Sequence, residues 1–309
     1  MTTQASQSVR EVSGLSPDPR VRVFRRVLED FDGMEVDSYV VLGSSHAIFL
    51  DTLTSPADMA QVMTLIKPDL DHRQVLCVNS HADWDHCWGN NFFTAPQHIS
   101  LPAQTIPILA HEYCRQRLLS PEAQSRLDGY KKSSAAFSEV TLVPPTLTFR
   151  EQLTIAAGDL TVELLHAPGH CPDQIVAWLP EIHLLLAFDA VERPLPSIDG
   201  SSCVPLMFSS LQRLAALDAR TVLCSHGNSH SPDLIHENLA YLNEIERRAR
   251  LLLQQRVPAD TELEQAATLV NYPFDEVIAH LNEEIDRAYY SSTHEQNVQA
   301  ILTYLRSNS

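Results

Sequence analysis

The chain has 309 residues, of which 44% are hydrophobic and 20% charged, and its formal net charge at pH 7 is −17. This composition is typical of a globular protein with a sizeable core, and no stretch approaches the roughly 20 apolar residues that cross a bilayer. A surface this negative repels phosphate backbones, which disfavours a nucleic-acid substrate. We therefore expect a small-molecule substrate and neither a nucleic-acid nor a membrane partner.

Residues 1–19 are polar and rich in Ser, Thr and Gln. They have neither the apolar core of a signal peptide nor the Arg-rich pattern of a transit peptide, so we interpret them as a flexible tail on a cytoplasmic protein. The six cysteines are scattered without a Cys-x-x-Cys pair. This spacing favours free thiols over a disulfide framework.

The first elements along the chain are predicted strands and a helix. Residues 21–49 contain β-rich runs separated by a turn signal, which predicts paired strands. Residues 56–66 are predicted to be helical, because Ser55 is a good N-cap and Pro56 suits the first helical position. The short apolar run Val75–Val78 then indicates a buried strand. It leads directly into a group of His and Asp residues, which therefore lies on the loop at the end of that strand.

Residues 94–135 have the pattern of loop and helix. Further strands are predicted after them, at Glu139–Val143, Leu147–Phe149, Leu160–Leu165, Ile175–Leu179 and His183–Phe188. A helix at Ser209–Leu217 and a strand at Thr221–Cys224 follow. Strands in two clusters, each followed by helices, indicate two sheets packed face to face with helices outside them.

The character of the chain changes after about residue 231. Apolar residues recur at helical spacing in four segments, Leu234–Gln255, Thr261–Leu269, Phe274–Tyr289 and His294–Leu305. We therefore expect a main domain at residues 20–230 and a helical C-terminal extension at residues 231–309 packed on it. The amphipathic helices of this extension are a candidate interface for a homodimer.

Four residues of the types that bind metals occupy six positions directly after the strand at 75–78: His81, Asp83, Asp85 and His86. On a loop leaving a strand, such spacing can direct alternate side chains toward two adjacent ions. Imidazole and carboxylate groups suit zinc, iron or manganese without any thiolate. The alternative is an ordinary solvated polar loop, but four ligand-type residues at this density argue against it.

Three later residues stand at the ends of other predicted strands. His170 follows the strand at 160–165, Asp189 follows the apolar run 184–188, and His226 follows the strand at 221–224. Taken singly, each is better explained as a cap or a surface residue. Because all three stand at corresponding ends of successive strands, we expect them to converge with the first group on one site.

In combination, these motifs resemble those of the metallo-β-lactamase-fold hydrolases. That family has the signature H-x-H-x-D-H, then a P-G-H segment, an Asp after an apolar strand and a final H-G segment. The corresponding segments here are His81–His86, Pro168-Gly169-His170, Phe188-Asp189 and His226-Gly227, and Phe49-Leu50-Asp51-Thr52 is similar to the family's second-strand ending. The resemblance covers roughly residues 20–230 and implies an α/β fold, a four-layer αββα sandwich with the site at one edge.

The resemblance also implies which residues share a metal. His81, Asp83 and His170 would hold the first ion, Asp85, His86 and His226 the second, and Asp189 would bridge them. The sequence departs from the family at two places, where Asp83 replaces the second His and Trp88-Gly89 replaces the usual Gly-Gly. A carboxylate at position 83 adds negative charge and hardens the first site, which favours iron or manganese relative to zinc. We expect two divalent ions, zinc first, with iron or manganese as alternatives.

Two cations about 3.5–4 Å apart can share a water and lower its pKa toward about 7. The predicted function is therefore a dinuclear hydrolase that uses a metal-bridging hydroxide on an ester, thioester, lactone or amide of a small molecule, with Asp85 orienting the nucleophile or moving its proton. Two alternatives stay open. One is a diiron oxygen or nitric oxide reductase, because flavodiiron proteins resemble this pattern and have Glu at the position of Asp83. The other is a non-catalytic binding module on the same fold.

Several neighbouring residues are not predicted to be ligands. Cys87 and Cys171 each follow a proposed ligand, but the seven positions already fill both sites. The remaining candidates are expected to be neighbours of the ligands, surface residues, pocket walls or packing residues, and they are His166, His230, Trp84, Trp88, Tyr289, Tyr290 and His294. For the last three, packing between helices is the favoured interpretation.

Overall fold

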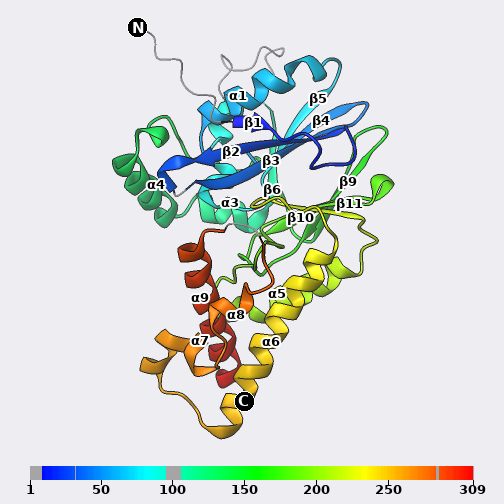
Figure 1. Ribbon diagram of the computed structural model, residues 1–309. Coiled ribbons are helices and arrows are strands. Elements are labelled where there is room, and N and C mark those ends of the chain that lie inside the picture. The colour runs from blue at the N-terminus through cyan, green and yellow to red at the C-terminus, as the bar shows by residue number, and fades with distance from the viewer. Residues whose placement is uncertain (1–8, 32, 95–105, 283–284, 309) are drawn as a thin grey trace.

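In the computed structural model, which describes residues 9–31, 33–94, 106–282 and 285–308, two β-sheets lie face to face (Figure 1). The first sheet has seven strands in the order β1 to β7, which are Val9–Glu11, Val21–Leu28, Met34–Leu42, His46–Leu50, Gln74–Val78, Ile108–His111 and Leu147–Phe149. Its first four strands are antiparallel neighbours, and β4 to β7 are parallel.

The second sheet has five strands in the order β12-β11-β10-β9-β8. These strands are Thr221–Cys224, Leu184–Phe188, Ile175–Leu179, Thr161–His166 and Gln152–Ala156. β12 and β11 are parallel, and the other neighbours are antiparallel. Consequently β9, β11 and β12 all run in one direction, and their carboxyl ends meet at the same edge of the sheet.

Helices cover the outer face of each sheet. The α-helices are α1 Pro56–Ile66, α2 Trp84–Cys87, α3 Glu112–Leu118, α4 Pro121–Ser133, α5 Val204–Ala215, α6 Asp233–Gln255, α7 Ala266–Leu269, α8 Phe274–Val277 and α9 Arg287–Ser307. Short 3-10 turns are η1 Glu29–Phe31, η2 Lys67–Asp69, η3 Asn90–Thr94, η4 Ala135–Phe137, η5 Pro180–Ile182, η6 Ser201–Cys203 and η7 Asp260–Gln265. Since α1 packs on the first sheet and α5, α6 and α9 on the second, the predicted αββα sandwich is confirmed.

Alternation along the strands explains the layers. In β4, Ile48 and Leu50 belong to the core between the two sheets, whereas Ala47 and Phe49 pack toward α1. Successive side chains of a strand point to opposite faces, so a strand that is apolar at every position becomes buried on both. The predicted helix 56–66 is confirmed as α1, with Ser55 as its N-cap and Pro56 in its first turn.

The lower part of the molecule in Figure 1 consists of the helices after α5. α6 and α9 pack against each other, and the first turn of α9 lies close to the sheets. Each of these two helices exceeds 20 residues. Within the described ranges, no helix is both long and apolar enough to span a membrane.

Four predictions of local structure are wrong. Residues 139–143 form no strand, because Val140 is instead buried against α3 and α4. The region read as loop and helix contains β6, a four-residue strand after Pro107. The helix expected at 274–289 ends at Val277 in α8, and α9 begins at Arg287.

The fourth concerns the N-terminus. Residues 1–8 lie outside the described residues, but Val9–Glu11 form β1, within the segment that we expected to be a flexible tail. Val9 and Glu11 are registered with Arg26 and Phe24 of β2, and Val9 is buried. Backbone pairing with β2 and burial of Val9 together hold this segment on the sheet.

Candidate metal centre

The candidate ligands lie where strands of both sheets end. His81, Asp83, Asp85 and His86 follow β5, with Asp85 and His86 in the short helix α2. His170 follows β9, Asp189 directly follows β11, and His226 follows β12. The carboxyl ends of β5, β9, β11 and β12 open on one edge of the sandwich, so segments far apart in the sequence meet there. All seven residues predicted from the sequence are brought together.

Four ligand atoms surround the first candidate metal position. Oδ2 of Asp83 lies 3.5 Å from Nε2 of His81 and 3.4 Å from Nε2 of His170. Oδ2 of Asp189 lies 3.6 and 3.7 Å from the same two nitrogens. Tetrahedral zinc with bonds of about 2.0–2.2 Å requires its ligand atoms to be roughly 3.3–3.6 Å apart. The four imidazole–carboxylate distances of this set, 3.4–3.7 Å, are close to that spacing.

A second set of four ligand atoms has similar distances between its imidazoles and carboxylates. Oδ2 of Asp85 lies 3.6 Å from Nε2 of His86 and 3.5 Å from Nε2 of His226. Oδ2 of Asp189 lies 3.2 and 3.5 Å from these nitrogens. One oxygen of Asp189 thus faces all four imidazoles, so Asp189 would contact an ion held by either set.

Several of these buried atoms have no hydrogen-bond partner among the described residues. They include Nε2 of His81, Nε2 of His86 and Oδ1 of Asp189. A buried polar atom without a partner costs free energy, so such atoms require an explanation. Lone pairs converging from imidazoles and carboxylates are the donor set that zinc, iron and manganese accept, and the residues present therefore fit a pair of divalent ions.

Asp51, the buried residue after β4, orients two of the imidazoles. Its Oδ1 accepts the backbone N–H of Ser80 at 2.6 Å, and its Oδ2 accepts the Ser80 hydroxyl at 2.7 Å and Nδ1 of His86 at 2.9 Å. The Ser80 hydroxyl also lies 2.9 Å from Nδ1 of His81. Because a carboxylate only accepts, the bond to Asp51 holds a proton on Nδ1 of His86, so Nε2 is the nitrogen that a cation would use.

His226 is oriented by β3 of the first sheet. Its Nδ1 donates to the carbonyl of Glu35 in β3 at 2.7 Å. The next residue, Gly227, accepts a hydrogen bond through its carbonyl from Arg25 of β2 at 2.7 Å. Arg25 is 1% exposed and forms two 2.7 Å bonds with the buried carboxylate of Asp37. A buried ion pair thus supports the loop that carries His226.

The backbone departs from regular geometry beside two ligands. Phe188, immediately before Asp189, has a φ of 50°, and Gly169, immediately before His170, has a φ of 154°. A Cβ at Gly169 would lie 2.6 Å from Cα of Met207 in α5. A bulky residue in the left-handed region costs free energy and persists only where its surroundings enforce it. Here the left-handed residue directs Asp189 away from β11 and toward the imidazoles.

Charges in the cluster balance one another. Burial lowers the pKa of His170 and His226, but the facing carboxylates outweigh burial: Asp83 and Asp189 raise the pKa of His170 to about 9, and Asp189 and Asp85 raise that of His226 to about 10. Burial acts in the opposite direction on Asp189, yet His86 and His226 hold its pKa well below the usual range. Without metal, protons therefore supply the positive charge that this site needs.

Three residues near the site were not found from the sequence: Arg117 in α3, Asp173 in the loop after His170, and Glu192 in the loop after Asp189. Arg117 forms ion pairs with Asp83 and Asp173. Each carries only a common charged side chain in an ordinary segment, so no sequence signal marked them.

Glu192 connects the loop that follows Asp189 with the C-terminal helices α6 and α9. Its backbone N–H and carbonyl are bonded at 2.9 and 2.8 Å to the side chain of Asn238 in α6. Its Oε1 accepts the hydroxyl of Tyr290 in α9 at 2.9 Å. Burial raises the pKa of Glu192 to about 7. Packing between helices explains His294, which is bonded to Tyr241 and Tyr272, but Tyr290 reaches the loop of the metal centre instead.

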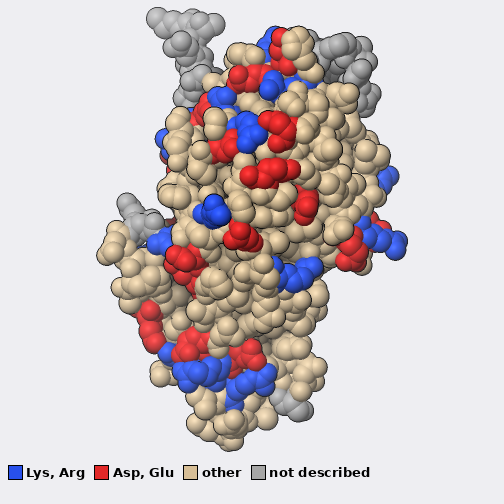
Figure 2. Space-filling model, turned by 90° about the vertical axis from the view of Figure 1, so that its right-hand side faces the viewer, with Lys and Arg blue, Asp and Glu red and all other residues tan. Residues whose placement is uncertain are grey.

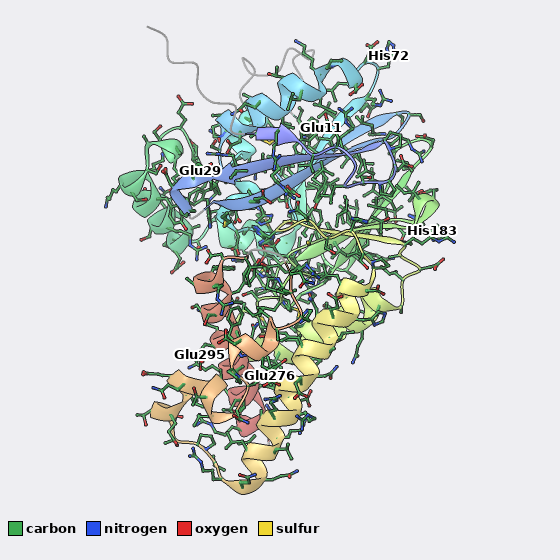
Figure 3. The ribbon with its side chains drawn as sticks, viewed as in Figure 1. Glu11, Glu29, His72, His183, Glu276 and Glu295 are labelled. Atoms are coloured by element: carbon green, nitrogen blue, oxygen red, sulfur yellow. The ribbon has the colours of Figure 1, made fainter. Side chains whose placement is uncertain are left out.

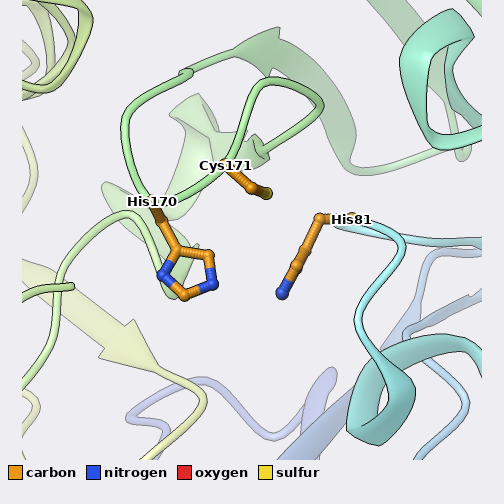
Figure 4. Close-up of side chains that lie close together, drawn as sticks. All are labelled: His81, His170 and Cys171. Carbon is orange, nitrogen blue, oxygen red and sulfur yellow. The ribbon is translucent and has the colours of Figure 1, made fainter. Parts of the chain in front are cut away.

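A thiol lies beside the first set. Figure 4 shows Cys171 close to the imidazoles of His81 and His170, and its sulfur lies within 4.8 Å of a nitrogen of each. Burial raises the pKa of the Cys171 thiol well above the ordinary value. The same holds for Cys87, whose thiol donates to the carbonyl of Asp83. All six cysteines are buried free thiols, as predicted.

Other candidates lie apart from the ligands. The ring of His166 stacks on His111 with centroids 3.9 Å apart, and His230 is exposed. Trp88 is buried in a cluster with Tyr130, and Trp84 contacts both. Other histidines stand farther away: Figure 3 labels His72 and His183, which precede β5 and β11 and so lie at the opposite ends of these strands.

Comparison with known families identifies this arrangement. The model of the metallo-beta-lactamase superfamily matches residues 32–226, well over half of the chain, and the chain belongs to that superfamily. Its members are largely metal-dependent hydrolases.

Individual relatives are more distant. The chain is 32% identical over 93 residues to a linear primary-alkylsulfatase of a Pseudomonas species, a match that covers 28% of this chain and only 18% of that enzyme. Two solved structures share the fold at 19% identity. A metallo-beta-lactamase family protein from Thermus thermophilus covers 95% of both chains with a TM-score of 0.64. A metallo-beta-lactamase from Pontibacter korlensis covers 75% of this chain and 97% of its own, with a TM-score of 0.56.

Proposed function

We propose that the chain is a dinuclear metal-dependent hydrolase acting on an ester, thioester, lactone or amide of a small molecule. One observation carries this proposal: Oδ2 of Asp189 lies 3.2–3.7 Å from Nε2 of four imidazoles. Asp83 and Asp85 complete the two sets around it. Zinc is the metal that we favour, since the imidazole–carboxylate distances in both sets, 3.2–3.7 Å, are close to those of a tetrahedral ion.

Two divalent ions held by these sets would acidify a shared water and polarise the oxygen of a bound substrate. The protein's own groups have three tasks. As described above, Asp51 holds a proton on Nδ1 of His86, so that Nε2 is the nitrogen offered to an ion. Asp85, 7% exposed, can accept a proton from the nucleophile beside His86 and His226. Glu192, with a pKa of about 7, can hold or release a proton at neutral pH.

The charge distribution supports a small-molecule substrate. The face in Figure 2 shows acidic and basic side chains interspersed. Over α6, for example, Arg247 is paired with Glu244 and Arg250 with Glu246. A nucleic acid would need a continuous basic surface to follow its phosphates. We therefore propose no nucleic-acid or membrane partner, and a homodimer as the arrangement to test by light scattering.

The test combines elemental analysis with a substrate panel. We expect two metal ions per chain and hydrolysis that a chelator abolishes and added zinc restores. The panel holds an ester, a thioester, a lactone, an amide and, because one relative is named an alkylsulfatase, a primary alkyl sulfate. Asp189→Ala should lose both ions, whereas Cys171→Ala should keep both and serves as the control for a nearby group outside the proposed ligands.

Two results would overturn the proposal. Less than one metal per chain, with activity insensitive to chelation, would exclude a dinuclear mechanism. Bound iron, O₂ consumption and no hydrolysis of any panel member would favour the diiron redox alternative, for which the acidic residue at Asp83 is the supporting observation. A protein that binds both ions but turns over nothing would favour a binding module.

A further inference from the structure

The two oxygens of Asp83 face different partners. Oδ2 faces Nε2 of His81 and of His170 at 3.5 and 3.4 Å, and it completes the first metal set. Oδ1 points away from this set and accepts a hydrogen bond from Nη2 of Arg117 at 2.6 Å. The carboxylate that replaces the family's histidine therefore offers one oxygen to a cation and gives the other to a guanidinium.

Arg117 is itself held in place. Its other terminal nitrogen, Nη1, bonds to Oδ1 of Asp173, a fully buried residue. Oδ2 of Asp173 in turn accepts the backbone N–H of Ala82 at 2.8 Å. Ala82 stands between His81 and Asp83 in the ligand loop. Arg117 thus bonds to a side chain of this loop, and Asp173 accepts from its backbone. A planar guanidinium can bond Asp83 and Asp173 at once because its donors have a fixed geometry.

We propose that Arg117 determines the metal specificity of the first site by keeping Asp83 a one-oxygen ligand whose charge is partly offset. The inference rests on the proposed dinuclear function. An imidazole is a neutral group that offers one donor atom. Asp83 beside Arg117 also offers one donor atom, and the guanidinium, which it shares with Asp173, offsets part of its charge. The hardening expected from a carboxylate at this position is thereby reduced, and the site keeps a four-coordinate geometry that zinc accepts.

Removal of Arg117 should reverse this effect. In Arg117→Met, Oδ1 of Asp83 loses its hydrogen-bonded guanidinium and keeps only the more distant, exposed Arg126, so Asp83 can bind an ion through two oxygens and raise the coordination number. Hard ions that accept more oxygen ligands gain from this change. Outer partners of metal ligands commonly alter metal affinity by about 10–100-fold. We expect the ratio of Mn²⁺ to Zn²⁺ affinity at the first site to rise by about tenfold or more.

The measurements use the purified full chain and do not require a substrate. Competition with a chromogenic chelator gives both affinities. The visible absorption of the Co²⁺-loaded protein reports coordination number, because tetrahedral Co²⁺ absorbs much more strongly than five- or six-coordinate Co²⁺. We expect weaker absorption from the first site in Arg117→Met than in the unaltered protein.

Two further variants test the assignment to Asp83. In an Asp83→His background, position 83 has no charge to pair, so Arg117→Met should leave the affinity ratio within about threefold, the size of a weak surface effect. Arg126→Met is the matched control, because Arg126 faces the same Oδ1 from 3.9 Å with a 55% exposed side chain, and it too should change the ratio by less than about threefold. Should Arg117→Met fail to fold, Arg117→Lys carries the test. A lysine lacks the two widely spaced nitrogens with which the guanidinium spans Asp83 and Asp173, so the ratio should rise in the same direction by about threefold or more.

The outcomes separate the two proposals. If the unaltered protein binds two ions and Arg117→Met, or Arg117→Lys in its place, has an unchanged affinity ratio, the role of Arg117 is overturned and the dinuclear function stands. An equal shift in the Asp83→His background would also overturn it. If the unaltered protein binds no ion at the first set, both proposals fail.

Discussion

Replacing Asp51 with Asn exchanges one oxygen for a nitrogen in a buried side chain that accepts three hydrogen bonds. Two of these bonds come from Ser80, and the third comes from Nδ1 of His86 at 2.9 Å. An amide nitrogen only donates, so at the position of Oδ2 it meets the His86 N–H donor to donor. His86 relieves the conflict when its proton moves to Nε2. That nitrogen faces Asp189 and Asp85, and once protonated it cannot bind a cation.

The magnitude has two parts. Second partners of metal-binding histidines typically contribute about 10–100-fold to metal affinity, and we expect a loss of this size at the second site. The metal-free protein loses at least one hydrogen bond to a charged group, which contributes about 1.5–3 kcal/mol to the free energy of unfolding. For a chain of this size, such a loss lowers Tm by about 3–8 °C.

Isothermal titration with Zn²⁺ measures the effect directly. Asp51→Asn should bind one ion with nearly unchanged affinity and the second about 10–100-fold more weakly. Asp58→Asn is a matched control. Asp58 is also buried and accepts from the hydroxyls of Thr54 and Ser55, but it lies at the start of α1 and its ion pair is with Arg26. It should lose stability and keep two tight sites. Two tight sites in Asp51→Asn would refute the reasoning.

Three further predictions concern pH, the buried ion pair and the C-terminal helices. In the folded metal-free protein the pKa values of His170 and His226 are about 9 and about 10, above the ordinary value near 6.5. The free energy of unfolding should therefore fall as pH rises from about 6.5 to 10, by up to about 1.4 kcal/mol per pH unit for each imidazole. Urea unfolding of the chelated protein at several pH values measures this. Arg25→Met should cost about 3–5 kcal/mol because it leaves a buried carboxylate unpaired, and adding Asp37→Leu should recover most of that loss in the same assay. Tyr290→Phe should lose about 1.5–3 kcal/mol while elemental analysis still finds both metals.

The ligands could be predicted from the sequence because each is local to a strand end. An apolar run that ends in His or Asp identifies both the strand and the side chain that leaves it, as Val75–Val78 does before His81. Parallel strands then bring such ends to one edge without any knowledge of packing. The same reasoning located His170, Asp189 and His226.

Arg117 could not be found in this way, because its position depends on β6. This strand has only four residues, and the sequence pattern around it predicts loop and helix. β6 lies parallel to β5, so the helix α3 that follows it begins at the edge where the ligand loop also begins. Without β6 there is no reason to place Arg117 near Asp83, 34 residues earlier in the chain.

An analogous error concealed the role of Tyr290. The sequence predicts a helix that ends at Tyr289, which places Tyr290 in the connection to the next helix. In the structure α9 instead begins at Arg287, and the side chain of Asp286 caps it by accepting the backbone N–H of Tyr289. Both tyrosines therefore belong to the first turn of α9. A helix is a rigid support, so this shift of a few residues changes Tyr290 from a loop residue into a fixed partner of Glu192.

The pairing of Asp83 also bears on how so acidic a chain could activate water. Three carboxylates, Asp83, Asp85 and Asp189, face the two metal positions, and each would cancel one positive charge of the bound ions. Because Arg117, which Asp83 shares with Asp173, offsets part of the charge of Asp83, two divalent ions would retain more of their positive charge at the site than they would beside an unpaired carboxylate. The acidity of a water between two ions rises with the positive charge around it. A substitution that by itself would weaken the activation of water is thus partly compensated by a contact of the same loop, in a chain whose net charge is −17.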